Sequence, residues 1–197
     1  MTPYMKGDTL VAAALSPMDA TRTVSIVVAF SLFNAIAAQV AIPIGPVPIT
    51  MQTFAVTLTG ALLGSRLGAA ALIAYLIEGA AGLPFFAGGT GGLGVLLGPT
   101  GGYLVSFPAA AYITGAFAEH GWDRRFLAAI AAMAIGSVVI LLGGWAWLTV
   151  GMKATPLGAF KVGVAPFLIG DVIKILLAAA VLPTGWALLK RKASGGK

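Results

Sequence analysis

Three things are scarce in this sequence of 197 residues: cysteine, histidine and charge. It has no cysteine, which excludes disulfide bonds and thiolate chemistry. Its one histidine, His120, does not build a metal site without several well-placed carboxylates, so we expect no metal. Only 9% of the residues are charged, 59% are hydrophobic, and the mean hydropathy of +0.99 lies far outside the range of a soluble domain. The composition therefore predicts a protein of the lipid bilayer.

The polar residues that remain do not indicate catalysis or nucleic-acid binding. The formal net charge is +6, but eleven of the twelve Lys and Arg residues are spread over loops and chain ends rather than gathered on one basic face. None of the Ser, Thr or His residues has the partners of an activated nucleophile. Rings of charge or repeated filter motifs, which are typical of ion channels, are not visible. We therefore expect neither an enzyme nor a bound cofactor.

Six apolar stretches meet or approach the roughly 20 residues that a membrane-spanning helix needs. They cover residues 23–42, 49–64, 67–82, 102–118, 126–150 and 164–189. The second and third are short, which favours helices that pack against protein around a cavity. The sequence thus predicts an all-α membrane protein with one domain of six transmembrane helices over residues 23–189, after a segment 1–22 and before a basic tail 190–197.

The distribution of positive charge predicts the orientation of these helices, because Lys and Arg in short loops stay in the cytoplasm. With the N-terminus inside, the outer loops hold only Lys153 and Lys161. The cytoplasmic segments then hold Lys6, Arg22, Arg66, Arg124, Arg125, Lys190, Arg191, Lys192 and Lys197. We therefore expect both termini in the cytoplasm, and the uncharged connections after the first and third helices on the outer side.

The second of these outer connections is rich in glycine and reads LPFFAGGTGGLGVLLGPTGGYL over residues 83–104. Gly89, Gly91 and Gly94 fit the spacing G-x-G-x-x-G of a dinucleotide-binding turn. That turn must follow a strand and open a helix in a soluble βαβ unit, and no such unit is predicted here. The glycines instead favour an outer loop that folds back into the bundle as a lid or wall of a ligand pocket.

Charged side chains within membrane helices are expensive and commonly functional, and the sequence has three: Glu78, Asp171 and Lys174. Asp171 and Lys174 are three residues apart and share one helix face. They either neutralise each other and tie the last helix to the bundle, or form a polar anchor in an outward-facing pocket, where Lys174 attracts an anionic group. Glu78 is either a pocket residue or an interface residue that water reaches.

Neutral polar residues in the helices add further candidates. Gln39, Gln52 and Tyr103 lie toward the outer side, where they either contact a ligand or support the structure. For Asn34 and Thr53 we expect hydrogen bonds between helices. We expect the tryptophans near helix ends to form interfacial belts, and these are Trp145, Trp147 and Trp186. His120 is expected on the surface of a cytoplasmic loop.

Three blocks of the sequence together resemble the BioY family, the biotin-specific substrate-binding component of energy-coupling factor (ECF) transporters. They are IPIGPVPITMQTFAVTLTGALLGSRLGAAAL from residue 42, GLPFFAGGTGGLGVLLGPTGGYL from residue 82 and GDVIK near the last helix, and the match extends over about residues 38–180. The resemblance implies a multi-pass protein of the bacterial inner membrane. It would bind biotin with high affinity from the outer side and deliver it inward with ATPase subunits and a transmembrane coupling subunit.

The resemblance also implies site residues. Asp171 and Lys174 match the family's ligand-binding pair, and the end of biotin that each contacts stays open. Gln52 and Tyr103 would add hydrogen bonds. The glycine-rich loop would cover the rings of biotin, and its candidate residues are Phe85, Phe86, Gly88, Gly89 and Thr90. Two alternatives remain: a sister component for another vitamin, and an ion-coupled carrier that works alone.

Overall fold

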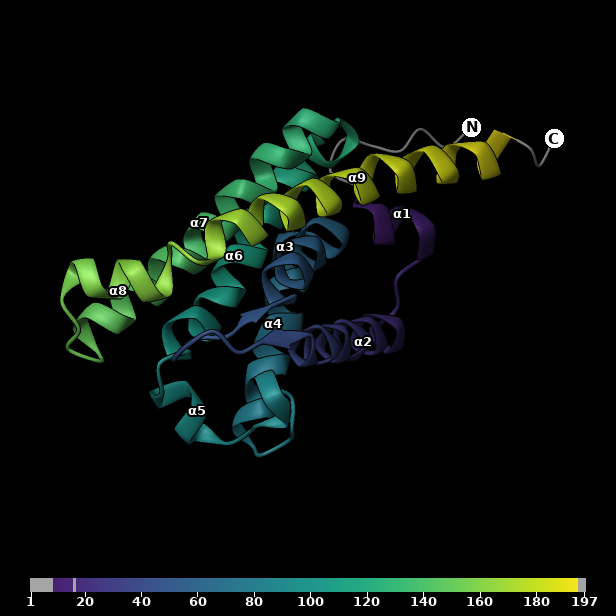
Figure 1. Ribbon diagram of the computed structural model, residues 1–197. Coiled ribbons are helices and arrows are strands. Elements are labelled where there is room, and N and C mark those ends of the chain that lie inside the picture. Colours follow the sequence, from purple (N-terminus) through teal and green to yellow (C-terminus); the bar gives the residue numbers. More distant parts are fainter. Residues whose placement is uncertain (1–8, 16, 195–197) are drawn as a thin grey trace.

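In the computed structural model, which describes residues 9–15 and 17–194, the chain forms a bundle of helices (Figure 1). The long ones are α2 (Ala20–Gln39), α3 (Gln52–Leu63), α4 (Ser65–Ala80), α6 (Gly101–Glu119), α7 (Phe126–Val150) and α9 (Phe167–Ser194). Each falls on one of the six predicted apolar stretches. Three helices, Ala20–Gln39, Phe126–Val150 and Phe167–Leu189, are long and apolar enough to cross a membrane, and six spans remain a prediction.

Shorter elements connect these helices: α1 (Leu10–Leu15), η1 (Ala87–Gly89), α5 (Leu93–Leu97), η2 (Trp122–Arg124) and α8 (Pro156–Gly163). One short element is not helical: β1 (Ala41–Ile42) and β2 (Ile49–Thr50) form an antiparallel hairpin in the otherwise mostly helical chain. Prolines at 43, 46 and 48 explain this, since proline lacks the backbone N–H that a helix interior requires. Within the second predicted stretch, 49–64, helix α3 therefore starts at Gln52 rather than at residue 49.

Glycines allow the central helix α6 to approach its neighbours closely. A Cβ atom on Gly60 of α3 would lie 2.2 Å from the carbonyl oxygen of Ala111 on α6. A Cβ atom on Gly136 of α7 would lie 2.4 Å from the hydroxyl of Thr114 on α6. Close backbone approach at small residues is typical of helices packed in a membrane. Asn34 follows the expectation of a hydrogen bond between helices, because its Nδ2 donates to Thr59 Oγ1 at 3.0 Å.

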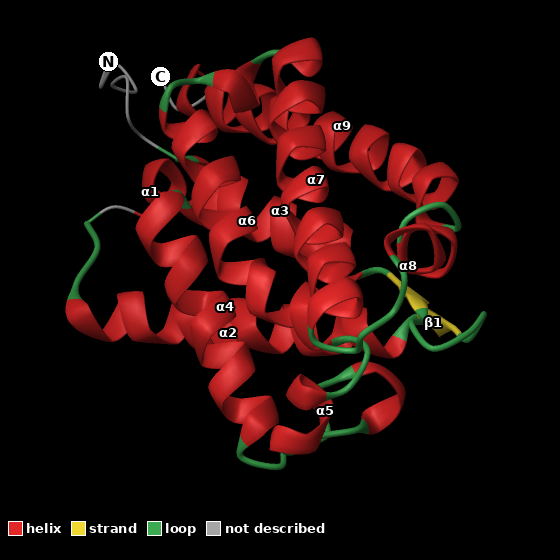
Figure 2. Cartoon of the chain, turned by 90° about the vertical axis from the view of Figure 1, so that its left-hand side faces the viewer, coloured by secondary structure: helices red, strands yellow, loops and turns green. Residues whose placement is uncertain are grey.

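The two ends of the bundle differ. The hairpin and α5 lie at one end, and the described chain ends lie at the other (Figures 1 and 2). At the end with the termini, His120 is exposed as predicted. The expectation that Trp186 belongs to an interfacial belt is wrong: it is buried, and its Nε1 donates to Asp123 Oδ2 at 2.5 Å. Trp145 and Trp147 lie at the end with the hairpin, where they donate to the carbonyls of Pro156 and Gly98.

Candidate functional site

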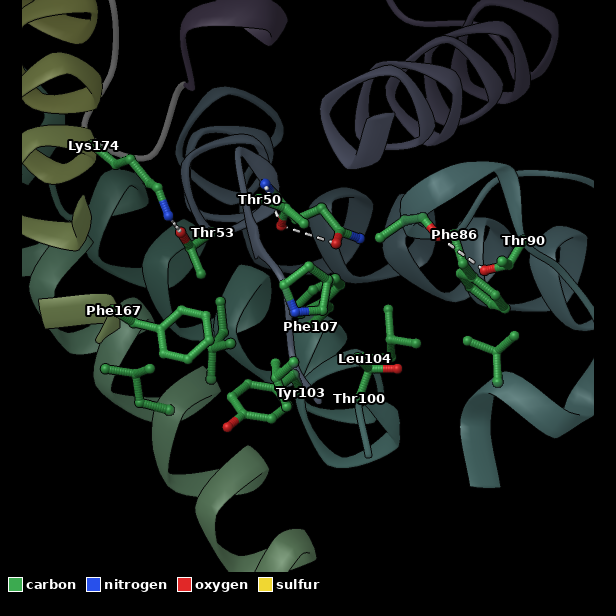
Figure 3. Close-up of a pocket in the computed structure, with 17 residues that line it drawn as sticks. Thr50, Thr53, Phe86, Thr90, Thr100, Tyr103, Leu104, Phe107, Phe167 and Lys174 are labelled. Carbon is green, nitrogen blue, oxygen red and sulfur yellow. Dashed lines mark hydrogen bonds between the residues drawn. The ribbon is translucent and has the colours of Figure 1, made fainter. Parts of the chain in front are cut away.

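A cavity of about 170 Å³ lies at the hairpin end of the bundle, between α3, α6, α7 and α9 and beneath the glycine-rich loop (Figure 3). Most of its lining is apolar, with side chains such as Phe107, Ile140 and Leu141. The polar groups in the lining come from Thr50, Gln52, Thr53, Thr90, Thr100, Tyr103 and Lys174. Lys174 is the one charged residue among them, so the cavity suits a small, largely apolar ligand with a group that attracts a cation.

Lys174 reaches the cavity from α9 through a network that fixes its ammonium group. Its Nζ donates to Thr53 Oγ1 at 3.0 Å and to Asp171 Oδ1 at 3.1 Å. Both charged side chains are nearly inaccessible to solvent, with 8% of Lys174 and 5% of Asp171 exposed. A buried charge is tolerated only when it is paired and hydrogen-bonded. The ammonium has three donors, of which these partners use two, and it lines the cavity.

Asp171 lies behind Lys174 and does not line the cavity. Its Oδ1 accepts from Thr53 at 3.1 Å, and its Oδ2 accepts from Ser137 on α7 at 2.5 Å. The carboxylate therefore connects α9 to both α3 and α7 while it compensates the charge of Lys174. The two interpretations of the pair are not exclusive, because this pair ties the last helix to the bundle and also places a cation at the cavity wall.

Tyr103 presents its ring to the cavity and uses its hydroxyl elsewhere. The hydroxyl donates to the carbonyl oxygen of Gly163 at 2.6 Å, at the end of α8. The ring lies 6.1 Å from that of Phe167, measured between centroids, and both line the cavity. Gly144 on α7 makes room for it, because a Cβ atom there would lie 2.1 Å from the tyrosine ring. The position of this ring therefore depends on a glycine of the facing helix.

Gln52 lines the cavity and begins a chain of hydrogen bonds that leads to the glycine-rich loop. Thr50 Oγ1 donates to Gln52 Oε1 at 3.0 Å, and Gln52 Nε2 donates to the hydroxyl of Tyr75 at 2.8 Å. Tyr75 in turn donates to the carbonyl oxygen of Phe85 at 3.2 Å. Hairpin, cavity wall and loop are thus connected through three side chains.

The glycine-rich loop places Phe86 and Thr90 in the cavity wall. The Phe86 ring is buried edge-on against Tyr75, with 5.6 Å between centroids, and Gly79 leaves space for it. Phe85 stacks on Tyr75 instead, with 6.5 Å between centroids, and does not line the cavity. Of the two neighbouring aromatic residues, Phe86 is therefore the one placed to cover a ligand.

Gln39 and two glycines shape the loop from outside the cavity. Gln39 Oε1 accepts from the backbone N–H of Gly89 at 2.9 Å, and its Nε2 donates to the carbonyl oxygen of Phe86 at 3.2 Å. Gly88 and Gly89 have φ angles of +72° and +69°, which side-chain-bearing residues rarely adopt. None of these three residues lines the cavity. They fix the conformation of the glycine-rich loop, which is the lid of the cavity, and they do not form the cavity wall.

Glu78 lies outside the cavity lining, on the face of α4 that meets α2. It accepts a hydrogen bond from Ser31, whose side chain is fully buried between these helices. Of the two expectations, a pocket residue does not fit this position, and a residue at the water interface stays a prediction, since the Glu78 side chain is only half-buried. In the structure, Glu78 connects α4 to α2 through this hydrogen bond.

Sequence reasoning did not place Thr53, Ser137 or Tyr75 in the site, although it predicted a hydrogen bond between helices for Thr53. The hydroxyls of Thr53 and Ser137 fix the charged pair, and Tyr75 joins the cavity to the loop. One signal was available for Thr53, since it follows Gln52 directly. Ser137 lies within the long apolar run of α7. Only its contact with Asp171 in the folded protein distinguishes it from other small polar residues in membrane helices.

The fold and the site define a class: a helical membrane protein with a mostly apolar cavity and a single cationic group in the wall of that cavity. Comparison with known proteins specifies it further. The family model described as "BioY family" matches residues 5–191, and the chain belongs to this family.

Individual relatives agree with this assignment. The chain is 40% identical over 163 residues to a probable biotin transporter BioY of Pyrococcus horikoshii, covering 81% of this chain and 93% of that one. It is 36% identical to the biotin transporter BioY of Thermotoga maritima, covering 77% and 88%. A crystal structure of the S-component for biotin from an ECF-type ABC transporter superposes with a TM-score of 0.73 at 27% identity, covering 85% and 93%.

Proposed function

We propose that this chain is the biotin-binding subunit of an ECF-type uptake transporter and that its cavity is the biotin site. The observation that carries the proposal is the buried, cationic Lys174 in the wall of an otherwise largely apolar cavity. Biotin combines a compact apolar ring system with a ureido group and a carboxylate, so it needs apolar walls and few polar contacts. Membership of the BioY family and the printed descriptions of the relatives support the same ligand.

Lys174 is the expected partner of an acceptor on biotin, and both the carboxylate and the ureido oxygen qualify. A charge-assisted hydrogen bond in a dry site is stronger than a neutral one. The methyl ester of biotin distinguishes the two ends, because it removes the anion and leaves the rings unchanged. If the carboxylate meets Lys174, the ester binds more weakly than biotin, and the difference disappears in Lys174→Ala.

The orientation follows from charge. We infer that the chain ends lie in the cytoplasm, with the hairpin and the glycine-rich loop outside, so that the cavity receives biotin from the outer side. Delivery inward then requires ATPase subunits and a transmembrane coupling subunit. The place of action is the cell membrane, which in a bacterium with two membranes is the inner one.

The ligand is tested by mass spectrometry of the small molecules that copurify with the protein and that exchange on incubation with a mixture of vitamins. Retention of biotin from the mixture supports the proposal. Retention of a different vitamin assigns the protein to a sister component. Uptake into vesicles that carry this subunit alone and respond to an imposed ion gradient would instead identify an ion-coupled carrier.

A further inference from the structure

A second concave surface lies on the membrane-facing side of the bundle, between α7, α8 and α9. Its lining contains only apolar side chains: Val138, Leu141, Leu142, Trp145, Phe160, Val164 and Leu168. Trp145 adds no donor to it, because its Nε1 is bonded to the carbonyl oxygen of Pro156 at 3.0 Å. Leu141 lines both this groove and the ligand cavity, so the two are separated by one side chain.

The depth of the groove indicates what can fill it. At a rise of about 1.5 Å per residue, Trp145 and Val138 lie about 8 and 18 Å from the end of α7 at Val150. With the end of α7 at the membrane surface and a hydrocarbon core about 30 Å thick, the groove extends from the level of the first acyl-chain segments to about the middle of the bilayer. An apolar groove at that depth accommodates hydrocarbon rather than water.

Positive charge lies close in the sequence to residues that line the groove. The connection between α7 and α9, residues 151–166, contains Lys153 and Lys161 and no acidic residue, and both lysines are exposed. Lys161 follows Phe160 directly in α8 and precedes Val164 by three residues, and both of these line the groove. A lysine with a flexible stem beside such a groove reaches the headgroup level and attracts a phosphate.

We propose that the groove binds one acyl chain of an anionic phospholipid whose phosphate is held by Lys161. The bound chain packs against the outer surface of Leu141, whose other side lines the ligand cavity. An anionic headgroup is preferred over a zwitterionic one because the latter carries its own cation beside the phosphate. This site is independent of the identity of the transported ligand.

Trp145 makes the groove accessible to experiment. The full-length protein is placed in nanodiscs of phosphatidylcholine that contain brominated phosphatidylglycerol or brominated phosphatidylcholine at the same mole fraction. Bromine quenches a nearby indole, and the contribution of Trp145 is the difference between the wild type and Trp145→Phe. We expect brominated phosphatidylglycerol to occupy the groove with a preference of about fivefold, the effect of one lysine near a lipid phosphate.

Two variants and two matched controls decide the outcome. Lys161→Gln should abolish the preference, and Leu142→Phe, which narrows the groove, should reduce quenching by both lipids. Two control variants should leave the lipid preference and the quenching unchanged. Arg66→Gln removes an exposed charge at the other end of the bundle, and Leu177→Phe changes an exposed apolar position of α9. Circular dichroism and gel filtration check the fold of each variant.

Several results would overturn the proposal. Equal quenching by the two lipids would mean that Trp145 meets only ordinary bilayer lipid. A preference that persists in Lys161→Gln would show that Lys161 does not hold the headgroup. Shielding of Trp145 from both lipids would mean that another protein surface, such as a second copy of the chain, covers the groove. Native mass spectrometry is the second measurement: retained phosphatidylglycerol in the wild type and its loss in Lys161→Gln support the proposal.

Discussion

Thr53 and Lys174 lie 121 residues apart in the sequence and are joined by a hydrogen bond of 3.0 Å between Oγ1 and Nζ. Thr53 has a single hydroxyl hydrogen, which it donates to Asp171, so the same oxygen accepts from the cation and donates to the anion of the pair. The ammonium group is therefore positioned from α3 as well as from its own helix. Changes in the supporting hydroxyls should affect ligand binding even where they do not line the cavity.

Ser137→Ala tests this support from α7. The serine hydroxyl donates to Asp171 Oδ2 at 2.5 Å, and its removal leaves a buried carboxylate oxygen without that donor, at a cost of about 1–3 kcal/mol. We expect a lower unfolding temperature in detergent and weaker biotin binding. Ser106→Ala is the control, because that hydroxyl bonds to Gly102 O within its own helix. Equal behaviour of the two variants would contradict a role of Ser137 in fixing the pair.

Gly144→Ala should narrow the cavity. The added methyl group would lie 2.1 Å from the Tyr103 ring, which must shift within a tightly packed wall. Overpacking of this kind costs about 1–3 kcal/mol, so we expect a loss of biotin affinity of about tenfold or more. Gly94→Ala is the matched control, since a Cβ atom there meets nothing within 4 Å. Titration calorimetry measures the affinity of both variants for biotin. Unchanged affinity in Gly144→Ala would show that Tyr103 is not part of the wall that binds the ligand.

Much of the helical framework was predictable, because long apolar runs have few alternatives in a membrane protein. Asp171 and Lys174 were also found from the sequence, since charges within apolar helices are rare. Thr53 was expected only to form a hydrogen bond between helices, and Ser137 was missed, because hydroxyl residues are common in membrane helices and only the packing of α3, α7 and α9 shows which of them meet a charge.

The errors have a similar origin. Trp186 was assigned from its position near a helix end, but its partner Asp123 is 63 residues away in the sequence and belongs to the connection between α6 and α7. Gln39 was predicted to lie at the level of the pocket. Its side chain points to the backbone of the glycine-rich loop, which helix periodicity does not reveal.

Gln39→Met should loosen the glycine-rich loop that forms the lid, while the size and shape of the side chain at this position are nearly preserved. It removes the hydrogen bond from Gly89 and the one to Phe86. With about 0.5–1.5 kcal/mol for each bond, we expect biotin to dissociate about tenfold faster. A chase of labelled biotin with unlabelled biotin measures this rate. Ile36→Met, one turn earlier on an exposed face, is the control, and equal rates in the two variants would show that Gln39 does not hold the lid closed.

Asp123 should make stability depend on pH. Burial raises the pKa of Asp123 above its ordinary value of 3.8, while the hydrogen bond from Trp186 and the charge of Arg124 act in the opposite direction. The folded protein then holds this proton more tightly than the unfolded chain does. The stability that protonation adds is therefore gained as pH falls through the raised pKa toward 3.8, and lost as pH rises.

Asp123→Asn removes this titration and keeps an oxygen to accept from Trp186. We expect the wild type to gain unfolding temperature relative to the variant as the pH is lowered from neutral. Thermal unfolding of both proteins in the same detergent, followed over pH, cancels the contributions of the other carboxylates. Parallel curves would show that Asp123 does not titrate differently in the folded and unfolded protein.

The central claim is that the cavity beside Lys174 binds biotin, and calorimetric titration of the purified wild type and Lys174→Ala with biotin tests it most directly. Arg66→Ala, at the opposite end of the bundle, serves as the control for loss of a positive charge. We predict saturable binding to one site in the wild type and the control, and a loss of about 2–5 kcal/mol in Lys174→Ala, because the ligand loses its cation and Asp171 is left uncompensated. Absence of saturable binding in the wild type, or full affinity in Lys174→Ala, would contradict the account.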